Sequence, residues 1–354
     1  MPDPRFRAVR WVPPRPSRPV PRRSDPRTLP PLRMIPLPGA GPEHVAFDAA
    51  GNIITGLEDG RIVCQSPDAT DPAAARVLAD TGGRPLGIER FGDDAFVVCD
   101  ADRGLLLLKT AGEPSIEVLC DRVDGQPLTL CSNAAIARDG TVYFTQSSRR
   151  FDLGHYKGDL LEHSGTGRVL RYRSGAGGGG VEGGGGGIGS GGEVEVLLDG
   201  LHFANGIVLS PDESSLVVAQ TGAYRLTRLW IAGEDAGTSE ALIDELPGFP
   251  DNLTTTPEGV IWVAMVSPRD ALLDWLHPRS PRLRSLVSSV PERLLPGPKD
   301  LAWVMAVDQG GGVLHDLRGW RAGYRAVTAV RRHGGKLYLG SLTADAVAVL
   351  DLAG

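Results

Sequence analysis

Hydrophobic and polar residues alternate in short stretches along most of this chain, and the stretches come in pairs joined by a turn. In FANGIVLSPDESSLVVAQT, residues 203–221, an amide precedes a short apolar stretch, a turn follows at Pro211 and Asp212, and a second apolar stretch comes next. Alternation with many β-branched residues predicts strands, and two such strands joined by a tight turn predict a hairpin. The pattern therefore predicts a series of β-hairpins with few long helices.

The same hairpin pattern occurs six times along the chain. The six segments are PEHVAFDAAGNIITGLEDGRIVC, RPLGIERFGDDAFVVCDADRGLLLL, CSNAAIARDGTVYFTQSS, FANGIVLSPDESSLVVAQT, FPDNLTTTPEGVIWVAMV and AVTAVRRHGGKLYLGSL. Aligned on the turn, they share one equivalent position, occupied by Glu43, Leu86, Asn133, Asn205, Asp251 and Thr328. Three of the five spacings between these positions are 43 to 47 residues, and the two longer ones contain insertions.

All-strand repeats of this length predict the blades of a β-propeller. Six repeats predict an all-β, six-bladed propeller over residues 34–354, with short helical insertions. The last repeat ends one strand short of a complete blade, and residues 34–38 (MIPLP) can supply the missing outer strand. A ring closed by this N-terminal strand leaves no exposed sheet edge at its junction.

Two insertions interrupt the repeats. The first, residues 149–192, contains a tract, residues 175–192, in which 13 of 18 residues are glycine. The tract lacks the flanking strand, helix and spacing of a phosphate-binding loop, so we expect a flexible loop. The second insertion, residues 268–300, predicts one or two short helices that form a lid. Contact with a membrane surface is the alternative, which its Arg and Pro content disfavours.

The first 33 residues differ in composition from the rest. They contain ten prolines and nine arginines against Asp3 and Asp25, which predicts a disordered arm over residues 1–33. Since the net charge of the chain is −6, the remainder carries −13, which disfavours nucleic-acid binding and is compatible with a hard cation. The sequence shows no signal peptide and no apolar run of about 18 residues, so we expect a cytoplasmic protein without a transmembrane segment.

The equivalent positions suggest a metal site, because the first strand of every propeller blade lines the central channel. Glu43, Asn133, Asn205 and Asp251, with Asn252 directly after it, would converge on that channel. Carboxylates buried together repel each other unless a cation compensates them. An all-oxygen donor set favours calcium, with another divalent cation as the alternative. A turn-capping role would explain any one of these residues but not four in register.

These motifs resemble those of strictosidine synthase-like proteins, which belong with the gluconolactonase/regucalcin and paraoxonase groups of six-bladed propellers. The resemblance covers about residues 35–354 and rests on RPLGI, GTVYFTQSS, GTGRVLRY, FANGIVLSPDE, GFPDNL and GKLYLGSL. In the lactonase and paraoxonase branches it implies a catalytic calcium, and the matching ligands here are Glu43, Asn133, Asn205, Asp251 and Asn252. It therefore implies metal-dependent hydrolysis of lactones or related esters.

The chain departs from its relatives at several positions. Thr328 stands where strictosidine synthase has its catalytic Glu, so an alkaloid-forming reaction is not expected. Leu86 and Asp100 stand where paraoxonases have a pair of histidines, and Gln146 replaces an Asp that is common in the related motif. No motif of a serine hydrolase, a zinc protease or a nucleotide-binding loop occurs. The four cysteines lack zinc-binding spacing and are expected to be buried thiols.

The resemblance implies that Asp251 is a metal ligand that doubles as the general base on water, while Glu43 only holds the metal. We expect Leu86, His202 and Thr328 to line the pocket for a small ester or lactone, with a surface or loop position as the alternative for His202. Because the histidine pair is absent, a second function stays open. The propeller would then bind a ligand or partner without catalysis, and its metal would hold the blades together.

Overall fold

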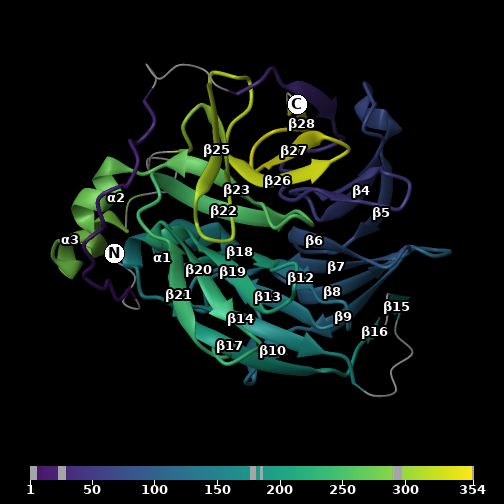
Figure 1. Cartoon of the computed structure of the whole chain (residues 1–354), viewed down its shortest axis with the longest axis horizontal. Coiled ribbons are helices and arrows are strands. Elements are labelled where there is room, and N and C mark those ends of the chain that lie inside the picture. The colour runs from purple at the N-terminus through teal and green to yellow at the C-terminus, as the bar shows by residue number, and fades with distance from the viewer. Residues whose placement is uncertain are drawn as a thin grey trace.

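The six predicted repeats form six four-stranded antiparallel sheets arranged around a channel (Figure 1). The computed structural model describes residues 6–22, 29–175, 181–183, 186–288, 290 and 297–352. In five sheets the strands pair in chain order, and the first strands of neighbouring sheets contact each other around the channel. The sixth sheet takes its outermost strand from the N-terminal part of the chain. The predicted fold, a six-bladed β-propeller closed by an N-terminal strand, is confirmed.

The blades follow one another along the chain. Blade 1 consists of β2 (Ala46–Phe47), β3 (Ile53–Gly56), β4 (Arg61–Gln65) and β5 (Arg76–Asp80). Blade 2 consists of β6 (Pro85–Phe91), β7 (Ala95–Asp100), β8 (Gly104–Lys109) and β9 (Ser115–Cys120). Blade 3 consists of β12 (Cys131–Ile136), β13 (Val142–Gln146), β14 (Gly167–Arg173) and β17 (Glu193–Leu201).

The second half of the ring repeats this plan. Blade 4 consists of β18 (Ala204–Leu209), β19 (Ser215–Gln220), β20 (Arg225–Trp230) and β21 (Ser239–Ile243). Blade 5 consists of β22 (Gly248–Thr255), β23 (Ile261–Pro268), β24 (Leu301–Val307) and β25 (Val313–Trp320). Blade 6 consists of β26 (Val327–His333), β27 (Lys336–Ser341), β28 (Ala346–Asp351) and β1 (Arg33–Pro36).

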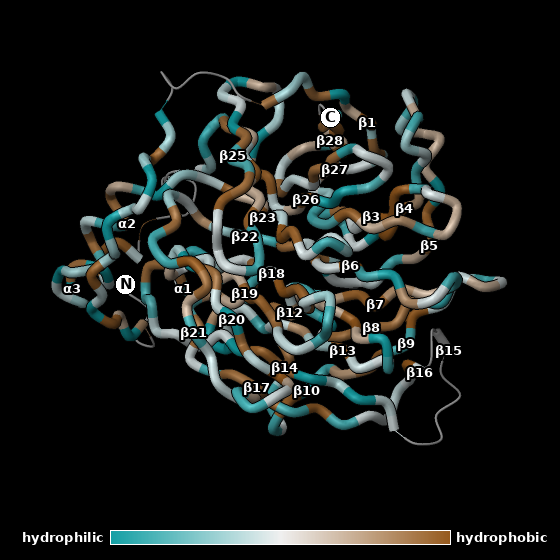
Figure 2. The backbone as a smooth tube through the Cα atoms, in the orientation of Figure 1, coloured by the Kyte–Doolittle hydropathy of each residue, from teal (hydrophilic) through white to brown (hydrophobic). Residues whose placement is uncertain are grey.

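Hydrophobic packing between neighbouring blades holds the ring together. Each of the six interfaces has its own cluster of buried apolar residues, drawn from the two blades that meet there. Between blades 1 and 2, for example, Ile54 and Ile62 pack with Phe96 and Leu108. Because both faces of each sheet are covered by neighbouring blades, a central strand such as β8 is apolar along almost its whole length. The hydrophobic segments accordingly coincide with the strands (Figure 2).

The ring closes where the sequence predicts. Strand β1 pairs antiparallel with β28, with Met34 opposite Ala348 and Ile35 opposite Val347. The Ile35 side chain is fully buried in the cluster between blades 6 and 1. Closure therefore combines a hydrogen-bonded strand pair with apolar burial, and it joins the first described strand to the last.

The insertions carry the helices of the protein. The first contains the 3₁₀ turn Leu153–His155, helix α1 (Tyr156–Glu162) and a small hairpin of β15 (Val181–Gly183) and β16 (Gly186–Ile188). The second contains α2 (Ala271–Leu276) and α3 (Pro281–Val287), which confirms the prediction of short helices. Short elements elsewhere are β10 (Arg122–Val123), β11 (Gln126–Pro127) and the 3₁₀ turns Pro72–Ala74 and Thr221–Ala223.

Several predicted features lie partly outside the described residues. These are residues 1–5 and 23–28 of the predicted disordered arm, and residues 176–180 and 184–185 of the predicted flexible Gly-rich loop. In the described part of that loop, Ile188 is fully buried in the cluster between blades 2 and 3. The loop therefore contributes an apolar side chain to the core of the propeller.

The N-terminal strap, residues 6–22, lies across the two insertions near α1, α2 and α3 (Figure 1). The Trp11 backbone NH donates to the carbonyl oxygen of His277 at 3.3 Å, and its indole ring stacks on His163 with the ring centroids 4.1 Å apart. This differs from the disordered arm that the composition of residues 1–33 predicts. Backbone hydrogen bonds hold the segment as well: the Arg7 NH donates to Glu162 Oε2 at 2.7 Å, and the Val9 NH donates to the carbonyl oxygen of Glu162 at 2.9 Å.

The four cysteines are free and buried, as predicted. Across the described ranges, no helix combines the length and the apolar character needed to cross a membrane.

Candidate functional site

The equivalent positions of the repeats lie at irregularities of the innermost strands. The pairing of the first strand with the second shifts at Leu86, Asn133, Asn205, Asp251 and Thr328, each of which falls inside the shift of its blade. In blade 1 the equivalent residue precedes the short strand β2. A β-bulge bends the strand and redirects a side chain, and such bulges are frequent next to active sites. The repeat thus places a bulge at the equivalent position of five of the six blades.

Glycines let the neighbouring blades approach closely at this level. A Cβ atom on Gly206 would lie 2.6 Å from the Cα atom of Asn252 and 2.4 Å from the backbone nitrogen of Leu253. A Cβ atom on Gly87 would lie 2.8 Å from the Cα atom of Asn133. These contacts leave no room for a side chain, so glycine at both positions allows the inner strands to bring their polar residues together.

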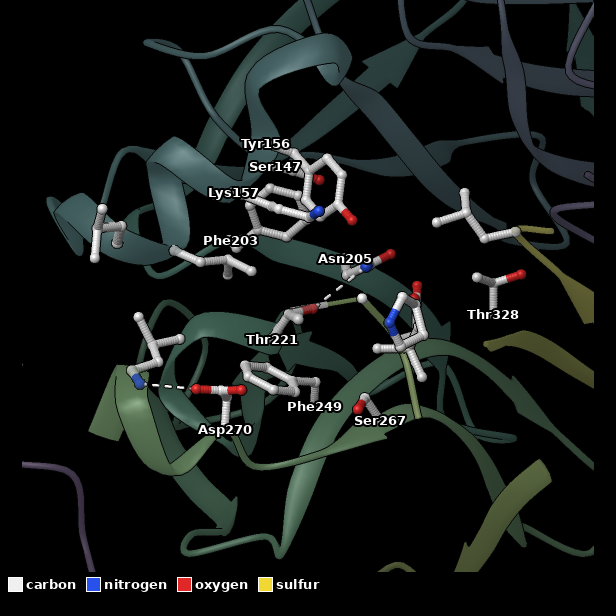
Figure 3. Close-up of a pocket in the computed structure, with 18 of the residues that line it drawn as sticks. Ser147, Tyr156, Lys157, Phe203, Asn205, Thr221, Phe249, Ser267, Asp270 and Thr328 are labelled. Carbon is white, nitrogen blue, oxygen red and sulfur yellow. Dashed lines mark hydrogen bonds between the residues drawn. The ribbon is translucent and has the colours of Figure 1, made fainter. Parts of the chain in front are cut away.

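A cavity of about 220 Å³ opens at this end of the channel. Five of the predicted residues line it, namely Glu43, Leu86, Asn205, Asp251 and Thr328. Figure 3 shows Asn205, Thr221 and Thr328 around its floor, with Phe203 and Phe249 on its walls (Figure 3). Five of the six equivalent side chains, one from every blade except blade 3, therefore meet in one cavity.

Two buried carboxylates lie at the cavity floor without full hydrogen bonding. Asp251 Oδ1 and Glu43 Oε2 are both buried and have no hydrogen-bond partner. Burial raises the pKa of Asp251 well above its usual value, and the nearby charge of Glu43 raises it further. Burial also raises the pKa of Glu43, while the Arg84 guanidinium acts in the opposite direction. Without a compensating cation, two ionised carboxylates are disfavoured here.

The amides around the carboxylates are held in two layers. Asn205 Oδ1 accepts a hydrogen bond from Ser132 Oγ at 3.1 Å, and its Nδ2 donates to Thr221 Oγ1 at 3.3 Å. Asn133 and Asn252 are buried and do not line the cavity; Asn133 Nδ2 donates to Asn252 Oδ1 at 3.0 Å. Of the predicted amide ligands, Asn205 therefore faces the cavity, whereas Asn133 and Asn252 bind each other behind it.

Thr328 supports the floor through the backbone. Its Oγ1 donates to the carbonyl oxygen of Glu43 at 2.8 Å, which joins blade 6 to the start of blade 1. Thr328 also lines the cavity, as predicted. A threonine here supplies no titratable group, but it fixes the backbone of a carboxylate residue.

His202 does not line the cavity, although the sequence predicts it as a pocket residue, and its neighbour Phe203 takes that place. Phe203 has a positive φ of 58°, so the chain turns sharply just before β18. The His202 ring instead stacks on His163 with the centroids 3.9 Å apart, and His277 lies 5.0 Å from His163. His202 thus belongs to a cluster beneath the N-terminal strap.

The three histidines of this cluster are held in their neutral form. Burial lowers the pKa of His202 and of His277 to about 4, and it also lowers that of His163, where the neighbouring histidines act in the same direction. Both ring nitrogens of His163 are buried without a hydrogen-bond partner. The positively charged groups that face the cluster are Arg225 and Arg284.

The wall of the cavity is mainly apolar and comes largely from the insertions. Apolar lining residues that the repeat pattern does not identify include Leu153, Tyr156, Leu160, Leu272, Leu273 and Leu276 from the insertions, with Leu130, Phe203 and Phe249 from the blades. Three charged residues, Lys157, Asp270 and Lys299, also line the cavity. Leu86, Leu130 and Phe203 form a buried cluster against which residues of the first insertion pack. The apolar residues in the two insertions were the only sequence signal for this wall.

The donor set fits a hard cation better than a transition metal. Within the described residues, no three His, Cys, Asp or Glu side chains gather in a way that could hold a metal ion. The floor offers instead two carboxylates with unpartnered oxygens and the amide Asn205. Carboxylate and amide oxygens are the ligands that calcium and magnesium prefer. The residues present therefore fit such an ion, provided that neutral oxygens complete its coordination.

Comparison with known proteins agrees with this architecture. Residues 45–272 match the SMP-30/gluconolactonase/LRE-like region. The chain is 31% identical over 358 residues to strictosidine synthase-like protein 10 of Arabidopsis thaliana, covering 92% of this chain and 89% of that protein. It is 32% identical over 334 residues to an adipocyte plasma membrane-associated protein of Salmo salar, covering 88% of this chain and 76% of that protein.

Solved structures show the same fold at lower identity. A gluconolactonase from Xanthomonas campestris superposes with a TM-score of 0.64 at 16% identity, covering 98% of this chain and 99% of that one. Regucalcin from Agrobacterium tumefaciens, a calcium-binding protein, gives 0.59 at 15% identity, covering 91% and 95%. By its matching region, this chain belongs to the SMP-30/gluconolactonase/LRE-like family, and its curated relatives include strictosidine synthase-like proteins.

Proposed function

We propose that this protein is a calcium-dependent hydrolase of lactones or related esters. The observation that carries the proposal is the pair formed by Glu43 and Asp251, two buried carboxylates with unpartnered oxygens at the floor of a largely apolar cavity. Such a pair suits a hard divalent cation. The similarity to a gluconolactonase and to a calcium-binding regucalcin supports both the reaction class and the ion.

Glu43, Asn205 and Asp251 would hold the ion from the cavity floor, and Asn133 and Asn252 stand behind them as further oxygen donors. When bound, the ion would supply a Lewis acid that polarises an ester carbonyl and stabilises the negative charge that develops on it.

Asp251 is the candidate general base. Its Oδ1 has no partner and borders the cavity, so it can accept a proton from a water molecule placed there. Asn205 is held on both sides by Ser132 and Thr221, which keeps its carbonyl oxygen on the floor. Glu43 contributes charge and support, and its backbone is fixed by Thr328.

The walls indicate what part of a substrate the cavity accepts. Leu86, Phe203 and Phe249 line it together with apolar residues of α1 and α2. A cavity of this kind excludes water and favours the apolar portion of an ester, while the polar floor receives its carboxyl group. We therefore expect lactones or esters with an apolar body to react faster than polar ones.

A second candidate function is binding without catalysis, with the ion holding the blades together. One observation favours it: among the described residues that line the cavity, none is a histidine or a cysteine. Acid–base chemistry at the floor would then depend on carboxylates alone.

A panel of lactones and aryl esters, each assayed with calcium and with a chelator, separates the two functions. The proposed hydrolase turns over at least one ester in calcium, loses this activity in chelator and regains it when calcium is restored. A protein that binds calcium stoichiometrically but turns over no ester of the panel is the non-catalytic alternative.

A further inference from the structure

Arg84 is a buried cation that lies behind Glu43 and outside the cavity lining. Its Nη2 donates to the carbonyl oxygen of Gly41 at 2.9 Å and lies 3.6 Å from Glu43 Oε2. Its Nη1 is buried without a hydrogen-bond partner. Leaving a guanidinium donor unsatisfied is costly. The position of this side chain is therefore best explained by the charge of Glu43, not by complete hydrogen bonding.

The structure fixes Arg84 at this place. Its backbone NH donates to Asp100 Oδ1 at 3.1 Å, and its carbonyl oxygen accepts a hydrogen bond from the Ala101 NH at 2.9 Å. Gly41 has a φ of +71°, and a Cβ atom there would lie 2.9 Å from Arg84 Nη2. The glycine thus leaves the space that the guanidinium occupies, and the end of the β6–β7 hairpin holds the arginine backbone.

Charges around the floor are distributed unevenly. Glu43 forms an ion pair with Arg84, which favours its charged form. Asp251 instead has Glu43 as its charged neighbour, and this like charge disfavours the charged form of Asp251. In the cation-free protein Arg84 is thus the counter-charge of one carboxylate of the pair. A divalent ion held by Glu43 would share this carboxylate with the Arg84 guanidinium, and like charges that are close together inside a protein repel each other strongly.

We infer that Arg84 is a positioning residue of the candidate cation site, a permanent counter-charge that holds Glu43 in place when no ion is bound and weakens the ion's binding so that it can exchange. Only the second role, the weakening of ion binding, rests on the proposed calcium site. The first role, holding Glu43 in place, concerns the protein without any metal. The two roles call for separate measurements.

The first measurement uses chelator and compares thermal unfolding of the wild type, Arg84→Met, Glu43→Gln and the double variant. We expect Arg84→Met to lower the melting temperature by several degrees because it leaves Glu43 without its counter-charge. In the Glu43→Gln background the same substitution should cost much less. Equal losses in both backgrounds would overturn the counter-charge role.

Arg168 offers a matched control, because its side chain is only 3% exposed and its Nε donates to Gln146 Oε1 at 2.8 Å, away from Glu43. Arg168→Met should lower the melting temperature equally with and without the Glu43→Gln substitution. If the loss of melting temperature caused by Arg168→Met depended on Glu43 as strongly as that caused by Arg84→Met, the comparison would report general destabilisation. This result would also count against the inference.

The second measurement titrates calcium into the metal-free protein by calorimetry. We expect Arg84→Met to bind calcium roughly tenfold more tightly than the wild type, since a buried positive charge is gone. Arg84→Lys, which keeps the charge, should stay close to the wild type. An Arg84→Met affinity equal to or weaker than that of the wild type would overturn the exchange role. If the wild type bound no calcium, the proposed function and this exchange role would both be overturned. The comparison of melting temperatures in chelator would still decide whether Arg84 is the counter-charge of Glu43.

Discussion

The floor and the wall of the cavity are made by different parts of the chain. The floor is polar, and its residues, such as Asn205 and Asp251, occupy equivalent positions of the repeated blades. The wall is apolar and comes mostly from insertions that break the repeat, including α1 and α2. The repeated part thus supplies the groups for chemistry, and the inserted part determines which molecules reach them.

The two regions are also held together differently. Residues of the floor are linked by side-chain hydrogen bonds across blades, for example from Thr328 to the backbone of Glu43. The insertions contact each other directly, since Arg284 Nη1 donates to the carbonyl oxygen of Leu161 at 3.0 Å. The N-terminal strap adds a further link, where Trp11 stacks on His163 and its NH donates to the carbonyl oxygen of His277. Substitutions in the floor should therefore alter ion binding and turnover, whereas substitutions at the strap should alter substrate affinity and stability.

The largest effect is expected at Asp251. Asp251→Asn removes the candidate base and a charged ligand, and ester turnover should fall by roughly a thousandfold. Folding should not suffer, because a buried carboxylate with an unpartnered oxygen is replaced by a neutral amide. The melting temperature in chelator should stay unchanged or rise. Turnover at the wild-type rate, with calcium still required, would remove Asp251 from the chemistry.

Asn205→Ala should weaken calcium binding about tenfold and lower the melting temperature in calcium, because one neutral oxygen ligand is lost. The effect in chelator should be smaller. Asn52→Ala serves as the control, since Asn52 is an amide in a turn that bonds Asp48 far from the cavity. Calcium affinity that is unchanged in Asn205→Ala would place the ion elsewhere.

Trp11→Ala tests the wall. The loss of a stacked indole should destabilise the protein by about 2 kcal/mol and loosen the insertions. We expect KM for apolar esters to rise several-fold while kcat changes little, which is the opposite of the Asp251→Asn result. Val12→Ala is the neighbouring control, because the Val12 side chain is 75% exposed. If Trp11→Ala reduced kcat with KM unchanged, the separation of floor and wall would fail.

The smallest effect concerns pH. Because burial holds the pKa values of His163, His202 and His277 below 6.5, the unfolded chain binds more protons than the folded one below pH 6.5. Stability contributed by these neutral rings is therefore complete above pH 6.5 and decreases as the pH falls toward 4.

His163→Phe keeps an aromatic ring in the stack and removes a titrating group whose nitrogens have no partner. It should leave stability unchanged at pH 7.5 and increase it by about 1 kcal/mol at pH 5.5 relative to the wild type. The control is His155→Phe, since the His155 side chain is 77% exposed and lies outside the cluster. Identical pH profiles for the wild type and His163→Phe would show that the cluster does not govern acid stability.

The floor could be anticipated from sequence because repeats constrain one another. Once six hairpins are aligned, equivalent positions such as Asn205 and Asp251 must occupy equivalent places around the channel. The bulges that redirect these side chains, and the pairing of Asn133 with Asn252 behind the floor, depend on details of register that residue patterns do not encode.

The wall could not be anticipated in the same way. Insertions have no repeat to align, and their contacts join residues that are distant in sequence, such as Trp11 and His277. The composition of residues 1–33 predicts disorder, because an average over the segment does not show the stacking of Trp11 or the backbone hydrogen bonds of residues such as Val9. The short separation between His202 and Asn205 in sequence predicts a pocket position for His202, but the sharp turn at Phe203 directs this side chain to the histidine cluster.

The most direct test of the central claim is a crystal structure of the protein grown with calcium. We expect one ion at the cavity floor, with oxygens of Glu43, Asn205 and Asp251 at about 2.3 to 2.6 Å. A structure in which that floor holds only water, or in which calcium binds away from both carboxylates, would contradict it.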